Sequence, residues 1–121
     1  MKLTIPGLLP GLNEYINAER TNKYAAATMK KQCEAVVMAE ARRQLKHIKL
    51  KTPVIMRYKW VEPNKRRDKS NISGYGRKVI EDGLIKAGII PNDGWNEIES
   101  FSDEFTVDKH NPRVEVEIKE A

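Results

Sequence analysis

The segment VIMRYKWV, from Val54 to Val61, decides the class of fold. Its apolar and aromatic residues stand at every second position, and Arg57 and Lys59 lie between them. Because successive side chains of a strand point to opposite faces of a sheet, this alternation predicts a strand with one buried face. We therefore expect a half-buried strand within a small sheet.

Two helices are predicted on either side of this strand in the sequence. Upstream, apolar residues recur every three or four positions, and Thr21 or Asn22 can cap a helix that reaches about residue 47. Downstream, the same period predicts a helix over about residues 75–87, and Gly88 is suited to end it in the left-handed conformation.

The rest of the chain is predicted to add three strands and a loop. The strands are expected near residues 2–5, 97–107 and 113–119. Residues 6–17 contain two prolines and two glycines and are predicted to be a loop. The order is then β-α-β-α-β-β. The class is α+β, with two helices packed on a small mixed sheet in a single domain over residues 1–121.

The composition favours one globular domain. A chain of 121 residues with 40% hydrophobic residues supports one small core and is not typical of a disordered segment. The longest apolar run, from Ala35 to Ala39, is far below the ~20 residues of a membrane-spanning helix. The start of the chain is interrupted by Pro6 and Pro10 and is a poor signal peptide. We therefore expect a cytoplasmic protein that does not enter a membrane.

Charge is distributed unevenly along the chain. Residues 29–69 contain thirteen lysines and arginines against four acids, whereas residues 92–121 contain three bases against nine acids. A basic surface gains affinity for a phosphate backbone, because every neutralised phosphate releases counterions. With a net charge of +5, the basic middle indicates a nucleic-acid partner, and the alternative is an ordinary solvated helix face.

The densest group of chemically active residues lies in PNKRRDKSNI, residues 63–72, where Asp68 stands among cations. Neighbouring positive charges keep a carboxylate ionised, and such a carboxylate can bind Mg²⁺ together with phosphate oxygens. Asp93 is the second candidate ligand. A helix between the two acids would separate them by ~18 Å. They share an ion only if the chain doubles back after Gly88 or if a second subunit supplies one acid.

At these residues the sequence resembles the RusA-type Holliday junction resolvases, a family of small dimeric endonucleases common in phages and prophages. The resemblance covers most of the chain, from Asn13 and Tyr15 to the final strand, and it is densest from Pro63 to Trp95. Its anchor is a basic run ending in Asp-x-Asp-Asn, then a helical lysine, Asp-Gly-Leu or Asp-Ala-Leu, and a later aspartate. The matching residues are Asp68, Asn71, Lys78, Asp82-Gly83-Leu84 and Asp93.

The resemblance implies a homodimeric endonuclease that cuts branched DNA at four-way junctions. In the family, three aspartates bind Mg²⁺, which activates water for phosphodiester hydrolysis, and the helical lysine assists. Asp68 and Asp93 are then two of the metal ligands, and Lys78 is the assisting lysine. A two-fold dimer suits a junction, because its equivalent strands can be cut in matched pairs. The residues expected to contact DNA are Lys65, Arg66, Arg67, Lys69, Asn71 and Arg77.

Two departures from the family pattern affect the expected chemistry. Ser70 stands at the position of the third aspartate, and a neutral hydroxyl is a poorer ligand for Mg²⁺. Activity is then reduced, shifted to Mn²⁺ or lost, unless Glu97 or Glu99 supplies the missing carboxylate from the predicted strand. The spacing from Asn71 to Lys78 is also longer than in shorter members, so the role of that lysine depends on an insertion between them.

The candidates also have purely structural interpretations. Asp68 can cap the following helix, Asp93 can belong to a turn, and Tyr75 can pack on the sheet instead of stacking on an unpaired base. Three functions therefore stay open. The chain is an active junction resolvase, a junction-binding protein that has lost catalysis through Ser70, or a general structure-specific nucleic-acid binder.

The remaining unusual side chains are not assigned a function. Cys33 lies among apolar residues at helical spacing, so a packed thiol is expected. His47 and His110 lack the spacing of metal ligands and are expected on the surface. Trp60 and Trp95 are expected to be structural.

Overall fold

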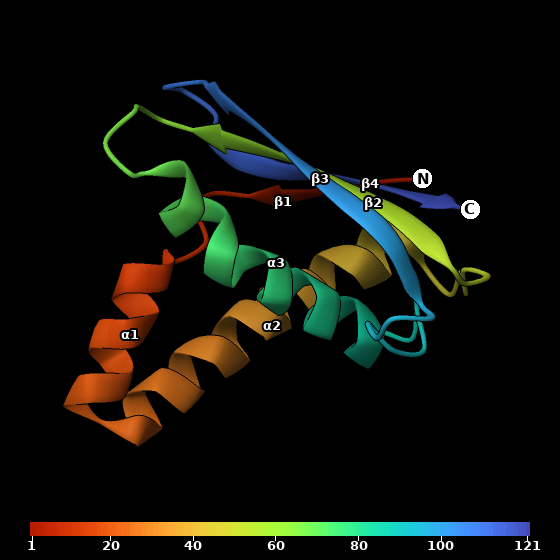
Figure 1. Cartoon of the computed structure of the whole chain (residues 1–121), viewed down its shortest axis with the longest axis horizontal. Coiled ribbons are helices and arrows are strands. Elements are labelled where there is room, and N and C mark those ends of the chain that lie inside the picture. Colours follow the sequence, from red (N-terminus) through yellow and green to blue (C-terminus); the bar gives the residue numbers. More distant parts are fainter.

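A four-stranded sheet with helices on one face forms the body of the protein, and the computed structural model describes residues 1–121 throughout (Figure 1). Across the sheet the strand order is β1-β4-β2-β3, with β2 parallel to β3 and the other neighbours antiparallel. The predicted α+β class with a small mixed sheet is confirmed. The elements are β1 (Lys2–Pro6), α1 (Leu12–Thr21), α2 (Lys23–Leu45), β2 (Val54–Glu62), α3 (Lys69–Lys86), β3 (Ile98–Val107) and β4 (Arg113–Glu120).

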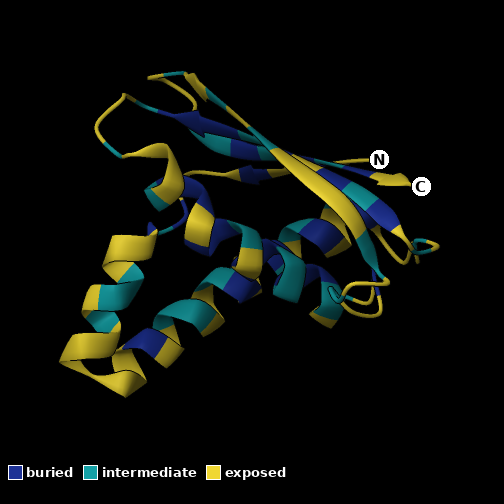
Figure 2. Cartoon of the chain, viewed as in Figure 1, coloured by how far each residue is buried: buried dark blue, intermediate teal, exposed yellow.

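The core lies between the sheet and the helices α2 and α3 (Figure 2). The alternation that predicted β2 is confirmed, because Met56, Tyr58 and Trp60 are buried on its helix-facing side. Where α2 crosses α3, a Cβ atom on Gly83 would stand 2.5 Å from a methyl carbon of Val37. Only glycine therefore lets the two helices approach this closely.

The prediction that residues 6–17 form a loop is wrong, because α1 begins at Leu12 and brings the number of helices to three. The order is therefore β-α-α-β-α-β-β. None of the residues of α1 is buried, although Leu12, Tyr15 and Ile16 stand at helical spacing. The prolines and glycines of residues 6–11 favoured the loop prediction over this signal. The helix is attached to α3 through Tyr15, whose ring stacks on that of Tyr75 with centroids 4.5 Å apart.

The predicted start of the third helix is also wrong, because α3 begins at Lys69, six residues before Tyr75. Gly74 and Gly76 had indicated a loop, yet both lie within the helix. A Cβ atom on Gly76 would stand 2.7 Å from the ring of Trp60, so this glycine serves close packing of α3 on β2.

Other boundaries agree with the sequence. The side chain of Asn22 accepts a hydrogen bond from the backbone N–H of Tyr24 at 2.7 Å, which confirms the predicted cap of α2. Gly88 has a φ of 80°, which confirms the left-handed residue after α3. No helix of the protein combines the length and the apolar character needed to cross a bilayer.

Candidate functional site

The basic middle of the sequence is not one surface in the structure. Arg57 and Lys59 project from the sheet face opposite the helices, where their strand neighbours are Glu117 and Glu115. Some cations of this region pair with acids, as Lys30 does with Asp82 at 3.2 Å. Other cations are exposed without an ion-pair partner on α2 and in the segment after it, namely Lys31, Arg42, Lys46, Lys49 and Lys51. Free positive charge therefore lies along α2 and the segment after it as well as in the loop before α3.

That loop carries three free cations around Asp68. Lys65, Arg66 and Lys69 are exposed, and none of them forms an ion pair within the chain. Asp68 is exposed as well and has no ion-pair partner. The loop and the end of β3 enclose a hollow of about 660 Å³, which Lys65, Asp68 and Lys69 line together with the ring of Phe105.

Asp68 occupies the N-cap position of α3 without acting as a side-chain cap. Its backbone is extended, with φ −68° and ψ 147°, and its carboxylate makes no capping hydrogen bond. The capping interpretation of this side chain is therefore wrong. The free backbone N–H groups of a helix start favour an anion nearby, and the carboxylate competes for that place with any incoming phosphate. Ser70 is exposed in the first turn of the helix.

Arg67 differs from its basic neighbours, because the protein itself occupies its guanidinium group. It donates two hydrogen bonds to the carboxylate of Glu62, at 2.9 and 2.8 Å, and one to the carbonyl oxygen of Leu9 at 3.0 Å. The hydrogen bonds to Glu62 raise the pKa of Arg67 above its ordinary value. Since Glu62 is only 6% exposed, it depends on this partner. Arg67 therefore holds the loop in place.

Asn71 and Arg77, which were also predicted to contact DNA, have partners within the chain. The side-chain oxygen of Asn71 accepts a hydrogen bond from the backbone N–H of Asn13 at 2.8 Å, which ties α3 to the start of α1. Arg77 forms an ion pair with Asp103, and its guanidinium carbon lies 4.5 Å from the ring centroid of Phe101. Both side chains are therefore already engaged in holding elements together.

The two predicted metal ligands lie against different parts of α3, Asp68 at its start and Asp93 beside Lys78 in its middle. Asp68 precedes the helix, whereas Asp93 lies in the turn that follows it. Asp93 meets α3 only at Lys78, ten residues after Asp68, which corresponds to ~15 Å along the helix axis. The two acids line different hollows of the surface. No three His, Cys, Asp or Glu side chains come together as a metal-binding group.

Lys78 bridges two aspartates on the second half of α3. Its ammonium nitrogen lies 2.8 Å from Oδ2 of Asp93 and 3.1 Å from Oδ1 of Asp82. The hydrogen bond to Asp93 is the main cause that raises the pKa of Lys78 above its ordinary value. The lysine that the resemblance marks as assisting is thus bound by one of the predicted metal ligands.

The two glutamates that could replace the missing carboxylate have different places. Glu97 closes the turn after α3, because its Oε1 accepts a hydrogen bond from the backbone N–H of Gly94 at 3.2 Å. Glu99 is exposed and lines the same hollow as Asp93. Glu99 is therefore the one of the two whose carboxylate is free for a further ligand.

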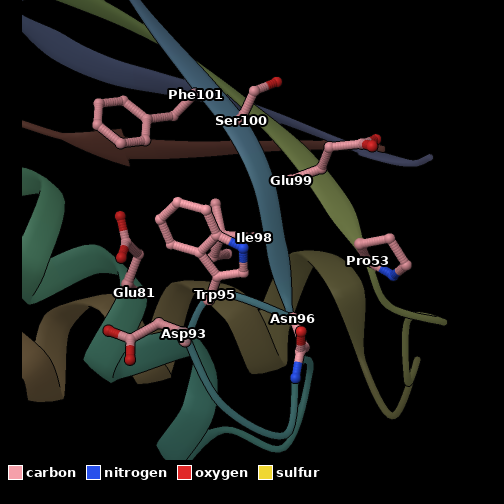
Figure 3. A pocket seen from close by; sticks show the side chains of 10 residues that line it. Pro53, Glu81, Asp93, Trp95, Asn96, Ile98, Glu99, Ser100 and Phe101 are labelled. Carbon is pink, nitrogen blue, oxygen red and sulfur yellow. The ribbon is translucent and has the colours of Figure 1, made fainter.

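The hollow beside Asp93 has a volume of about 670 Å³ and includes two residues whose role the sequence did not reveal (Figure 3). Glu81 lines it, accepts a hydrogen bond from the Tyr58 hydroxyl at 3.0 Å, and has a pKa raised mainly by burial. The prediction that Trp95 is structural is wrong, because its side chain is 96% exposed. Trp60 is buried, as predicted. The places of Glu81 and Trp95 follow from the packing of α3 and the turn after it, which no local pattern encodes.

The structure agrees with the predicted positions of the three other side chains to which no function was assigned. His47 and His110 are exposed. Cys33 is half-buried against the core, and burial is the main cause that raises the pKa of its thiol.

In comparisons with known proteins, no family model matches the chain and no curated protein matches it.

Proposed function

We propose that the protein is a structure-specific DNA endonuclease that resolves four-way junctions as a homodimer. The observation that carries the proposal is the group of unpaired charges before α3, where Asp68 stands among Lys65, Arg66 and Lys69. Three free cations beside a helix N-terminus favour phosphate groups. The carboxylate of Asp68 among them has no ion-pair partner and is exposed, so it is accessible to a cation that a phosphate brings with it.

Metal-dependent cleavage requires acids that one chain keeps apart. Because Asp68 and Asp93 line different hollows, with Asp68 before α3 and Asp93 beside its middle, we infer that Asp68 of one copy meets Asp93 of a second copy. A two-fold dimer would then contain two equivalent sites, as two matched cuts in a junction require.

A junction-binding protein without cleavage is the second candidate, and the contact between Lys78 and Asp93 favours it. The ammonium group neutralises the carboxylate that would hold a metal ion. Ser70 removes another negative charge from the predicted ligand set. In this case the free cations of the loop bind DNA and the hydrolytic reaction is absent.

The experiment that tests the proposal is cleavage of a synthetic four-way junction in Mg²⁺ or Mn²⁺, with linear duplex of the same sequence as control. The wild type is compared with Asp68→Asn, Asp93→Asn and Ser70→Asp. We expect junction-selective cutting that both Asn variants abolish. Tight binding without cutting, rescued by Ser70→Asp, would support the second candidate. Equal affinity for junction and duplex, without cutting, would overturn the proposal.

A further inference from the structure

Trp95 exposes its indole to solvent, whereas the only other tryptophan is buried. The side chain of Trp95 is 96% exposed, against 1% for Trp60. An indole ring in water leaves a large apolar surface unburied, which is unfavourable for folding. The stacked ring pairs of the protein involve other aromatic residues, so no ring covers the indole of Trp95.

The turn that carries Trp95 is held by hydrogen bonds on both sides of the indole. The carbonyl oxygen of Gly94 accepts hydrogen bonds from the backbone N–H groups of Glu97 and Ile98, both at 3.1 Å. Asp93 ties the same turn to α3 through its contact with Lys78 at 2.8 Å. The backbone that carries the ring is therefore held in place, which limits the ordering that a stacking ligand requires to the side chain itself.

The hollow next to Trp95 combines apolar walls with hydrogen-bond acceptors (Figure 3). Its apolar lining includes Ile98 and Phe101, and its carboxylates include Glu81 and Glu99. No lysine or arginine lines it, so the hollow offers no counter-charge to a phosphate group. A flat ring that carries N–H donors fits this lining, because it meets apolar surface with its faces and carboxylate oxygens with its edge.

Phe101 and Glu81 give the hollow an aromatic side and a polar side. The ring of Phe101 is 51% exposed, and the Arg77 guanidinium lies 4.5 Å from its centroid. Burial raises the pKa of Glu81, whose carboxylate already accepts a hydrogen bond from Tyr58. An N–H donor from a ligand would satisfy the remaining acceptor sites of this partly desolvated group.

We propose that this hollow binds an unpaired nucleobase, which stacks on Trp95 and directs its amino edge to the carboxylate of Glu81. The inference rests on the proposed function, because DNA at a branch point can supply such a base. Adenine, cytosine and guanine carry exocyclic amino groups, whereas thymine offers only a ring N–H. Since Asp93 borders the hollow, the base belongs to a nucleotide next to the phosphate that is cut.

The test is titration of the full chain with short single strands of deoxyadenosine, deoxycytidine or thymidine. Intrinsic fluorescence is followed for the wild type, and the affinities of the wild type and all variants are measured by the fluorescence anisotropy of labelled strands. Trp60 is buried, so a change in emission on binding reports Trp95. The variants are Trp95→Ala and Trp95→Phe, and Tyr24→Ala is the matched control, because Tyr24 is a 72% exposed aromatic residue outside the hollow.

We expect quenching by the deoxyadenosine and deoxycytidine strands and weaker quenching by thymidine strands. Trp95→Ala should weaken single-strand binding about tenfold, the size of one lost stacking interaction. Trp95→Phe should keep most of the affinity, and Tyr24→Ala all of it. Equal affinities of the wild type and Trp95→Ala would overturn the inference. Emission that responds to an arginine-rich peptide and to no oligonucleotide would also overturn it and would assign the hollow to a protein partner.

Single-strand binding and junction cleavage together distinguish a failure of this inference from a failure of the proposed function. Junction cleavage by the wild type with unchanged single-strand binding in Trp95→Ala would retain the endonuclease and overturn the base pocket. Weaker binding of labelled amino-bearing strands by Trp95→Ala, in a protein that does not distinguish junction from duplex, would retain the pocket and overturn the junction-specific endonuclease.

Discussion

The ammonium group of Lys78 lies 2.8 Å from the carboxylate of Asp93, so two residues expected to act on a phosphate neutralise each other. The same ammonium lies 3.1 Å from Asp82. Lys78 therefore stands between two acids and serves as their shared counter-ion. Any cation that binds to Asp93 from outside must compete with it.

Replacement of this lysine should expose the acids. We expect Lys78→Met to increase the affinity of the protein for Mn²⁺ several-fold, as measured by calorimetric titration, because two neighbouring carboxylates lose their internal counter-ion. The free energy of unfolding should fall by less than about 1 kcal/mol, since exposed ion pairs stabilise little. Lys86→Met is the control, because Lys86 lies on α3 like Lys78 but pairs with Glu34 of α2. An equal increase in both variants would contradict the expectation.

The neighbouring arginines Arg66 and Arg67 should respond in opposite ways to replacement by alanine. Arg67→Ala leaves Glu62 buried without its partner, so we expect a loss of about 3 kcal/mol in the free energy of unfolding, measured with urea. Arg66→Ala should leave stability unchanged, weaken junction binding, and reduce the salt dependence of binding by about one phosphate contact. A loss of stability in Arg66→Ala of the same size would show that the loop depends on both residues.

The fold could be predicted from the sequence where buried residues recur at regular intervals along the chain. The alternation around Tyr58 produces β2, and Gly88 ends α3 as expected. The two errors concern α1, which was predicted to be a loop, and the start of α3. α1 buries no residue, and Gly76 serves contact with Trp60 although glycine is typical of a loop.

The candidate site was predicted less well than the fold, because its residues acquire their roles through contacts distant in sequence. The basic run around Asp68 could be found locally, and the structure places it in one exposed loop. That Arg67 is bound to Glu62 and Leu9, while Arg66 is free, depends on how the loop folds back. The exposure of Trp95 likewise follows from the shape of the turn and not from its composition.

The buried hydroxyl group of Tyr75 has no hydrogen-bond partner within the chain. We expect Tyr75→Phe to stabilise the protein by about 1 kcal/mol, because the change removes an unsatisfied polar group and keeps the ring that stacks on Tyr15. Tyr58→Phe is the control and should destabilise, since it removes the hydrogen bond to Glu81. Thermal unfolding measures both. A destabilised Tyr75→Phe would mean that the hydroxyl group has a partner, such as an ordered water molecule.

The pH dependence of stability should report Glu81. Burial raises its folded pKa above the ordinary value of 4.5, so ionised Glu81 costs stability above the folded pKa. The cost disappears as the pH falls from the folded pKa to 4.5, because the folded protein takes up the proton first. Glu81→Gln should therefore be more stable than the wild type at neutral pH and lose this advantage in acid, in urea unfolding at both pH values. The exposed Glu99→Gln should show no such change.

Mixing two inactive variants should decide whether one site draws on two copies. If Asp68 of one copy works with Asp93 of the other, a mixed dimer of Asp68→Asn and Asp93→Asn contains one site with both aspartates and one with neither. We therefore expect the mixture to regain cutting of a labelled junction, with one strand nicked per dimer instead of two, while each variant alone stays inactive. The variants must be mixed under conditions that exchange subunits, and a mixture of Asp68→Asn with an Asp68→Asn, Asp93→Asn double variant is the control. If each site used both acids of a single chain, every site of the mixed dimer would lack one aspartate, and activity would not return. Recovery of cutting would therefore mean that Asp68 of one copy and Asp93 of the other act on the same phosphate.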